Sequence, residues 1–134
     1  MAVTIIYPEV HNLLLKGRVP SKKNSKRRIR RGNATYMVPS EAHEAWHEEQ
    51  MIALRYQWPS KLTITKAQSV EIIFYPPDRR KADLSNKAES VMDLLVDAGI
   101  LADDSWFVVP TLTLIRAEVS PKDPRAIIKI TMEL

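Results

Sequence analysis

The chain has 134 residues, a net charge of +4 and no cysteine. This length predicts one domain, residues 1–134, that is large enough to have its own hydrophobic core. The lack of cysteine excludes disulfides, thiolate catalysis and cysteine-based zinc sites, and it fits a cytoplasmic protein. No apolar run approaches the roughly 18 residues that a membrane-spanning helix needs. The N-terminus also lacks the basic and apolar parts of a secretory signal.

The positive charge is concentrated near the N-terminus. Nine Lys and Arg residues and no acidic residue lie between Lys16 and Arg31, whereas the rest of the chain carries a net charge of −5. A basic segment on an otherwise acidic domain favours a polyanionic partner such as nucleic acid. The alternative is a solvated loop that only keeps the protein soluble.

In chain order, the first predicted elements are two short strands, over Val3–Tyr7 and Leu13–Lys16. Residues 18–33 are predicted to form a basic loop without regular structure, because proline and glycine mark its two ends. Thr35–Val38 is a predicted strand that closes this loop as the hairpin partner of Leu13–Lys16.

Two helices are predicted, and each has a capping residue at its start. Ser40 is the expected N-cap of a helix over about residues 41–56. Asp83 is the expected N-cap of a helix over about residues 84–98, and Gly99 stands where a helix commonly ends. Apolar residues recur at helical spacing in the second helix, which indicates a face that packs on the core.

Three further strands complete the predicted fold. Ser69–Tyr75 is almost continuously apolar, which is typical of a central, covered strand. Phe107–Val119 and Ala126–Leu134 follow, and Pro110 indicates an edge position or a bulge in the first of them. The fold class is therefore α+β, with a mixed sheet of about four to six strands and two main helices.

Carboxylates cluster around the second predicted helix. Seven of the sixteen acidic residues lie within Asp78–Asp104. Asp83 starts the helix, Glu89 lies along it, and Asp103–Asp104 follow its end, so a chain that goes out and returns can bring them together. Such carboxylates are ligands for Mg²⁺, beside the cations that would face a phosphate chain, Arg79, Arg80 and Lys81. The alternative is that Asp83 only caps the helix and that Asp93 and Asp97 form a solvated face.

A second motif, H-E-x-x-H, runs from His43 to His47 and matches the zinc-binding helix of metalloproteases. A zinc protease also needs a third ligand, and the extended form of the motif is absent. The alternative is a pair of surface histidines near phosphate or a partner, and the zinc content of the purified protein decides between the two.

Four segments resemble the RusA family of Holliday junction resolvases. They are G-R-V-P-S-K-K-N-S-K-R from Gly17, P-P-D-R-R-K-A-D-L-S-N from Pro76, D-L-L-V-D-A-G from Asp93 and L-A-D-D-S from Leu101. The resemblance implies a RusA-like fold and an endodeoxyribonuclease, bacterial or phage-encoded, that cuts four-way junction DNA by paired symmetric nicks. It also implies a homodimer that depends on Mg²⁺, for which Mn²⁺ can substitute.

The resemblance assigns roles to individual residues. Asp83 corresponds to the first metal-binding aspartate, Asp104 to the late one, with Asp103 beside it, and Asn86 to the signature asparagine. Asp93 corresponds to an aspartate within the helix.

Two positions depart from the family pattern. Ser85 stands where a second aspartate is expected and Glu89 where a functional lysine is expected. Glu89 lies at i+4 from Ser85, so it can supply the missing carboxylate. The predicted catalytic residues are Asp83, Asp104, Glu89 and Asn86, and the predicted metal ligands are Asp83, Asp104, Asp103 and Glu89. The alternative function is a non-catalytic junction-binding protein with a degenerate metal site.

The predicted nucleic-acid-binding residues come from the basic segment and from the loop before the second helix. They are Lys22, Lys23, Asn24, Lys26, Arg27, Arg28, Arg30, Arg31, Arg79, Arg80 and Lys81.

Overall fold

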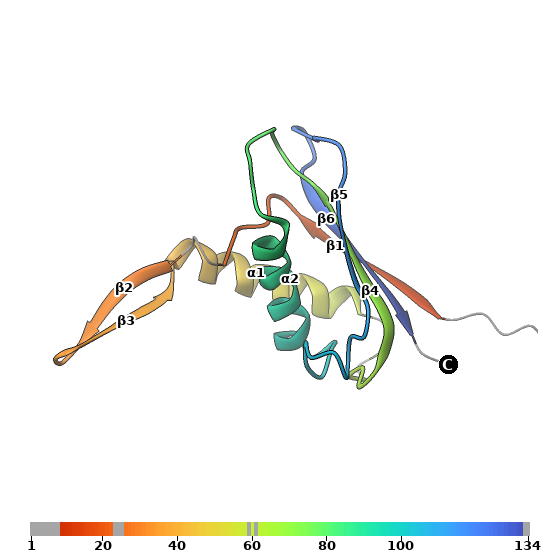
Figure 1. Ribbon diagram of the computed structural model, residues 1–134, viewed down its shortest axis with the longest axis horizontal. Helices are drawn as coiled ribbons and strands as arrows, with labels where there is room; N and C mark the ends of the chain where they lie inside the picture. The colour runs from red at the N-terminus through yellow and green to blue at the C-terminus, as the bar shows by residue number, and fades with distance from the viewer. Residues whose placement is uncertain (1–8, 23–25, 59, 61, 133–134) are drawn as a thin grey trace, which may run out of the picture.

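The computed structural model describes residues 9–22, 26–58, 60 and 62–132. It contains a four-stranded mixed sheet with two helices on one side, and a two-stranded ribbon that projects away from them (Figure 1). The predicted α+β class is confirmed. The strand expected over Val3–Tyr7 lies outside the described residues. No helix in the described part of the chain is both long and apolar enough to cross a membrane.

The main sheet has the strand order β1 (Val10–Lys16), β6 (Arg125–Met132), β4 (Ala67–Tyr75) and β5 (Leu112–Arg116). Strand β6 is antiparallel to both of its neighbours, whereas β4 and β5 are parallel. The apolar strand β4 is central, and β5 is at an edge, as the sequence predicts. Strand β5 is shorter than expected, because the residues before Pro110 turn back on themselves: the amides of Val108 and Val109 donate to the Ser105 carbonyl.

The ribbon corrects two predictions about the basic segment. Residues 26–31 are not a loop but strand β2 (Lys26–Arg31), which pairs with β3 (Ala34–Pro39). Gly32, with φ of +61°, supplies the positive φ that a two-residue hairpin loop favours. The predicted pairing of Leu13–Lys16 with Thr35–Val38 is also wrong. Leu13 and Leu15 are buried, and β1 gains this burial by pairing with β6 instead.

The two helices begin and end close to their predicted positions. Helix α1 (Glu41–Gln57) is capped by Ser40, whose Oγ accepts from the His43 amide at 3.1 Å. Helix α2 (Leu84–Asp97) is capped by Asp83 and is followed by Gly99, with φ of +77°. At the C-terminal end of α1, the Gln57 amide bonds both the amide and the carbonyl of Leu14, so it covers backbone groups of edge strand β1.

The hydrophobic core lies between α2 and one face of the sheet. Val91, Leu94 and Leu95 of α2 are fully buried, as are alternate residues of the central strands, among them Ile72 and Ile128. Because side chains alternate along a strand, the residues between them point to the opposite face of the sheet.

Candidate active site

Asp83 lies at the N-terminus of α2, and its carboxylate is held by the first turn of the helix. Oδ1 accepts from the Ser85 amide at 3.2 Å and from Ser85 Oγ at 2.8 Å, and Oδ2 lies 3.4 Å from Asn86 Nδ2. The capping role is therefore observed. Ser85 and Asn86, two residues of the signature stretch, fix the orientation of this carboxylate.

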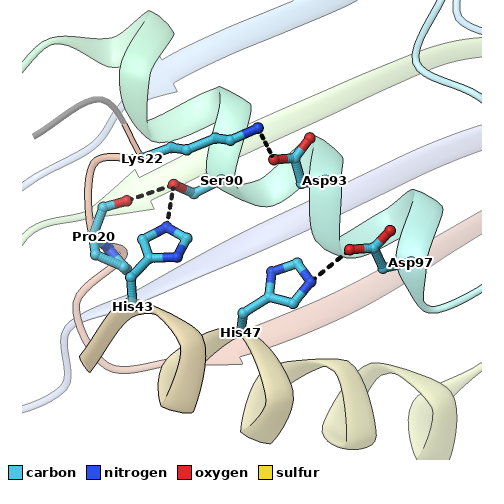
Figure 2. Close-up of polar contacts among 7 residues, drawn as sticks. All are labelled: Pro20, Lys22, His43, His47, Ser90, Asp93 and Asp97. Carbon is cyan, nitrogen blue, oxygen red and sulfur yellow. Dashed lines mark hydrogen bonds and ion pairs between the residues drawn. The ribbon is translucent and has the colours of Figure 1, made fainter. Parts of the chain in front are cut away.

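The acidic side of α2 binds the basic segment that follows β1 (Figure 2). Lys22 Nζ lies 2.6 Å from Asp93 Oδ2. The hydrogen bond to Asp93 is the main cause that raises the pKa of Lys22, and the charges of Glu89 and Asp104 act in the same direction. One ammonium group is therefore within electrostatic reach of carboxylates from the middle of α2 and from the loop beyond its end.

Two further contacts fasten the same segment to α2. The Pro20 carbonyl accepts from Ser90 Oγ at 2.8 Å, and the Val19 carbonyl accepts from Lys87 Nζ. Burial lowers the pKa of Lys87, and nearby Arg18 adds to this. The sequence prediction missed both Lys87 and Ser90. The sequence signal for these two residues was their i, i+3 spacing, which places both on one side of the helix. In the structure Ser90 is fully buried among the apolar residues of the helix.

The histidines of the H-E-x-x-H motif link the two helices (Figure 2). His43 Nε2 lies 3.3 Å from Ser90 Oγ, and His47 Nε2 lies 2.7 Å from Asp97 Oδ2. Because the Ser90 hydroxyl donates its proton to Pro20, His43 Nε2 is the donor in the first contact. His43 is only 5% exposed, so the expectation of two surface histidines is wrong for it.

The predicted magnesium ligands are exposed oxygen donors, which is the chemistry that a hard cation prefers. Among the described residues, however, no group of three or more His, Asp or Glu side chains is placed to hold a metal ion. The Asp83 carboxylate caps α2, and the Asp93 carboxylate forms an ion pair with Lys22. The ligand set Asp83, Asp104, Asp103 and Glu89 therefore remains a prediction.

A cation-lined pocket of about 280 Å³ lies beside the start of α2. Its wall includes seven Lys and Arg residues, of which the sequence predicted three: Arg79, Arg80 and Lys81. The four that it missed are Arg18, Lys87, Arg116 and Arg125. The only acid that the described residues contribute to the wall is Asp78, which Arg80 binds through Nε at 3.0 Å, a contact that lowers the pKa of Asp78. The excess of cations on this wall favours the binding of an anion.

A second pocket, of about 440 Å³, is lined in part by Asp83. The two pockets share Arg18, Lys81 and Lys87. Ser21 and Trp46 also line the second pocket, and their buried Oγ and Nε1 atoms have no hydrogen-bond partner within the described residues. Buried donors are normally paired, so these two are exceptions in the wall of the pocket.

The remaining predicted DNA-binding residues lie mostly on the ribbon. Lys26, Arg28, Arg30 and Arg31 are exposed there, whereas Lys23 and Asn24 lie outside the described residues. Arg27 is different, since its guanidinium lies 2.9 Å from Glu41 and 3.8 Å from Glu44 of α1. Arg27 therefore attaches the ribbon to the helix.

These features define a small α+β protein with a carboxylate, Asp83, at the N-terminus of a helix and cations around it. The family model "Endodeoxyribonuclease RusA" matches residues 18–131, nearly the whole chain. The chain therefore belongs to the RusA family of endodeoxyribonucleases, which resolve Holliday junctions, and the resemblance seen in the sequence is confirmed. No curated protein matches the chain.

Proposed function

We propose that this protein cuts four-way DNA junctions by paired symmetric nicks, as a homodimer that depends on Mg²⁺ or Mn²⁺. Membership of the RusA family supports the reaction class. The observation that carries the proposal is the lining of the second pocket, where Asp83 lies with Arg18, Lys81 and Lys87, three cations that also line the first pocket. This arrangement gives a phosphodiester cationic contacts next to a carboxylate.

The residues of the chain act mainly by holding the DNA backbone. Arg18, Lys81 and Lys87 bind phosphate oxygens. The dipole of α2 favours an anion at its N-terminus as well. The strand is thereby held against Asp83.

Exposed carboxylates at Asp83, Glu89, Asp103 and Asp104 would hold the divalent ion. When bound, such an ion lowers the pKa of water and neutralises charge on the phosphate. Asn86 keeps the Asp83 carboxylate oriented through its side-chain amide.

A homodimer fits the substrate, because a four-way junction is nearly two-fold symmetric. Two copies of the site can then reach two opposed strands, and the paired nicks release two duplexes. The exposed cations of the ribbon contact the junction arms in this proposal.

The test is cleavage of a labelled four-way junction and of a linear duplex with the same sequence, in Mg²⁺, Mn²⁺ or EDTA. We expect paired, metal-dependent nicks on the junction alone, and their loss in Asp104→Asn. Nicks that persist in EDTA, or an active Asp104→Asn variant, would contradict the proposed ligand set.

The second candidate is a junction-binding protein without activity. The observation that favours it is the lack of a metal-binding group within the described residues, together with Ser85 and Glu89 at positions that depart from the family pattern. Tight junction binding without cleavage in either metal would establish this function instead.

A further inference from the structure

Two adjacent aromatic side chains, Trp106 and Phe107, lie on the surface just after Asp104. Trp106 is 77% exposed and Phe107 is 75% exposed. Their rings contact each other edge to face, with centroids 6.1 Å apart. The other two tryptophans, Trp46 and Trp58, pack against the hydrophobic core instead. Large aromatic side chains that stand together on the surface indicate a contact with a partner.

The loop that carries this aromatic pair is fixed at both ends. Before the pair, the Ala102 amide donates to the Ile64 carbonyl at 2.9 Å. After the pair, Val108 and Val109 are buried, and the Val108 carbonyl accepts from the Ala67 amide at 2.8 Å. Because the two rings extend from an anchored turn, binding a partner costs them less conformational entropy than it would cost a loose segment.

The chain itself limits the distance between the aromatic pair and the carboxylates. Consecutive Cα atoms lie about 3.8 Å apart, so the Cα atoms of Trp106 and Asp104 are within about 7.6 Å of each other. The Asp104 charge also helps to raise the pKa of Lys22, which binds Asp93 of α2. Successive nucleotides of a duplex strand lie about 3.4 Å apart along the helix axis. Bases one or two steps from a phosphate at Asp104 are therefore within reach of the rings.

We infer that Trp106 and Phe107 stack on an exposed nucleobase at the branch point of the DNA, and that this contact distinguishes a junction from a linear duplex. The inference rests on the proposed function, because that function places the cleaved phosphate at the neighbouring carboxylates. Aromatic side chains stack on the flat face of every kind of base. Inside a linear duplex both faces of a base are covered by neighbouring pairs, whereas the stack is interrupted where strands pass from one helix to another.

The surroundings of the aromatic pair favour a nucleobase over a protein surface. Within residues 102–109, all of which the structure describes, the exposed residues besides the two rings are Ala102, Asp103 and Asp104. A stable protein interface covers about 800 Å² on each partner, and charged residues are depleted at its centre. Two rings bounded by two carboxylates make a smaller and more acidic surface. This surface fits one stacked base whose phosphate lies at the carboxylates.

The experiment compares the affinity of the full chain for a four-way junction and for a linear duplex of the same sequence. Ca²⁺ replaces Mg²⁺, so that a divalent ion is present during binding. We expect Trp106→Ala and Phe107→Ala each to raise the junction Kd by about fivefold or more and to leave the duplex Kd unchanged. The slope of log affinity against log salt should stay the same, because neither substitution removes a charge.

Two further variants test whether the aromatic ring itself is needed. Trp106→Phe keeps a ring that can stack, and it should retain most of the junction affinity. Tyr56→Ala is the matched control, since Tyr56 is an aromatic residue that is 93% exposed near the end of α1. This control should change neither Kd.

Photochemical cross-linking locates the base that the rings contact. The probe is a junction that carries 5-iodouracil at the branch point, and mass spectrometry identifies the residue to which it cross-links. We expect cross-links to Trp106 or Phe107. The same probe placed in the middle of a junction arm should give no cross-link to either residue.

Four outcomes overturn the inference. They are an unchanged junction Kd in both alanine variants, an equal loss of affinity for junction and duplex, branch-point cross-links to other residues alone, and a change in the mass of the protein in solution on Trp106→Ala, measured by sedimentation equilibrium. The last outcome would show that the rings contact protein. Nuclease activity is tested separately: a wild type that cleaves junctions while these variants bind them normally retains the proposed function and loses only this inference.

Discussion

Lys22 is the residue whose role depends most on contacts between distant parts of the chain. Its ammonium binds Asp93 and is electrostatically coupled to Glu89 and Asp104. It therefore partly neutralises the carboxylates that are proposed to receive a divalent ion, and the ion and the ammonium compete for the same charges.

We predict that Lys22→Met lowers the Mg²⁺ concentration needed for half-maximal junction cleavage. Removal of one positive charge near the carboxylates favours the ion by a factor on the order of three to ten. The measurement is cleavage rate against Mg²⁺ concentration at saturating DNA. Lys122→Met, a control in the turn before β6, should leave the midpoint unchanged; a rise in the Lys22→Met midpoint would contradict competition.

His43 predicts a dependence of stability on pH. Burial is the main cause that lowers the pKa of His43, and the neighbouring His47 adds to it. In the unfolded chain the residue regains its ordinary pKa near about 6.5. As the pH falls below that value, the unfolded state takes up a proton that the folded state resists, and the free energy of unfolding decreases.

We expect His43→Asn to be less stable at neutral pH, since it loses the Ser90 contact, but to lose less further stability on acidification. Urea unfolding at about pH 7.5 and about pH 5.5 measures both effects. His11→Asn removes a histidine outside the helix interface and is the control. A fall in stability that is as steep in His43→Asn as in the wild type would show that other groups cause it.

At the scale of elements, the ribbon separates two neighbouring arginines by function. Side chains alternate along a strand, so Lys26, Arg28 and Arg30 lie on one exposed face, and Arg27 and Ile29 lie on the other. Arg27 is bound to Glu41 and Glu44, whereas no ion pair of Arg28 is found within the described residues. A two-stranded ribbon fits the major groove of DNA, and its cationic face is the one free to contact phosphates.

We therefore predict that Arg28→Gln weakens junction binding and reduces the slope of log affinity against log salt by about 1. Arg27→Gln should change the slope much less, because its charge is already paired with α1. Both slopes come from binding titrations at several salt concentrations without added Mg²⁺. Equal changes in the two variants would show that the ion pairs to α1 do not exclude Arg27 from DNA.

At the scale of the whole molecule, α2 connects the core to the site. Leu95 is fully buried on its inner side, while Lys87 and Asp93 bind the segment after β1. Leu95→Ala should lower the free energy of unfolding by about 2 to 5 kcal/mol, because it leaves a cavity. Ile52→Ala, at a position of α1 that is 61% exposed, should change it by less than about 0.5 kcal/mol. Urea unfolding of both variants measures the difference, and similar costs would contradict the proposed position of the core.

The sequence by itself determined the features that depend on a few neighbouring residues. Ser40 and Asp83 cap their helices, and Gly99 follows the second one, because a cap needs only a side chain and the next turn of backbone. The central strand β4 was recognisable from its apolar run, and the family from its motifs.

The tertiary structure decided which distant residues meet. Strand β1 pairs with β6, and not with residues 35–38, because only the sheet buries Leu13 and Leu15. Lys22 reaches Asp93 because Lys87 and Ser90 of α2 bind the segment that carries it. This strand pairing and this ion pair depend on contacts between residues far apart in the chain. The periodicity of one segment does not specify the segment with which it pairs.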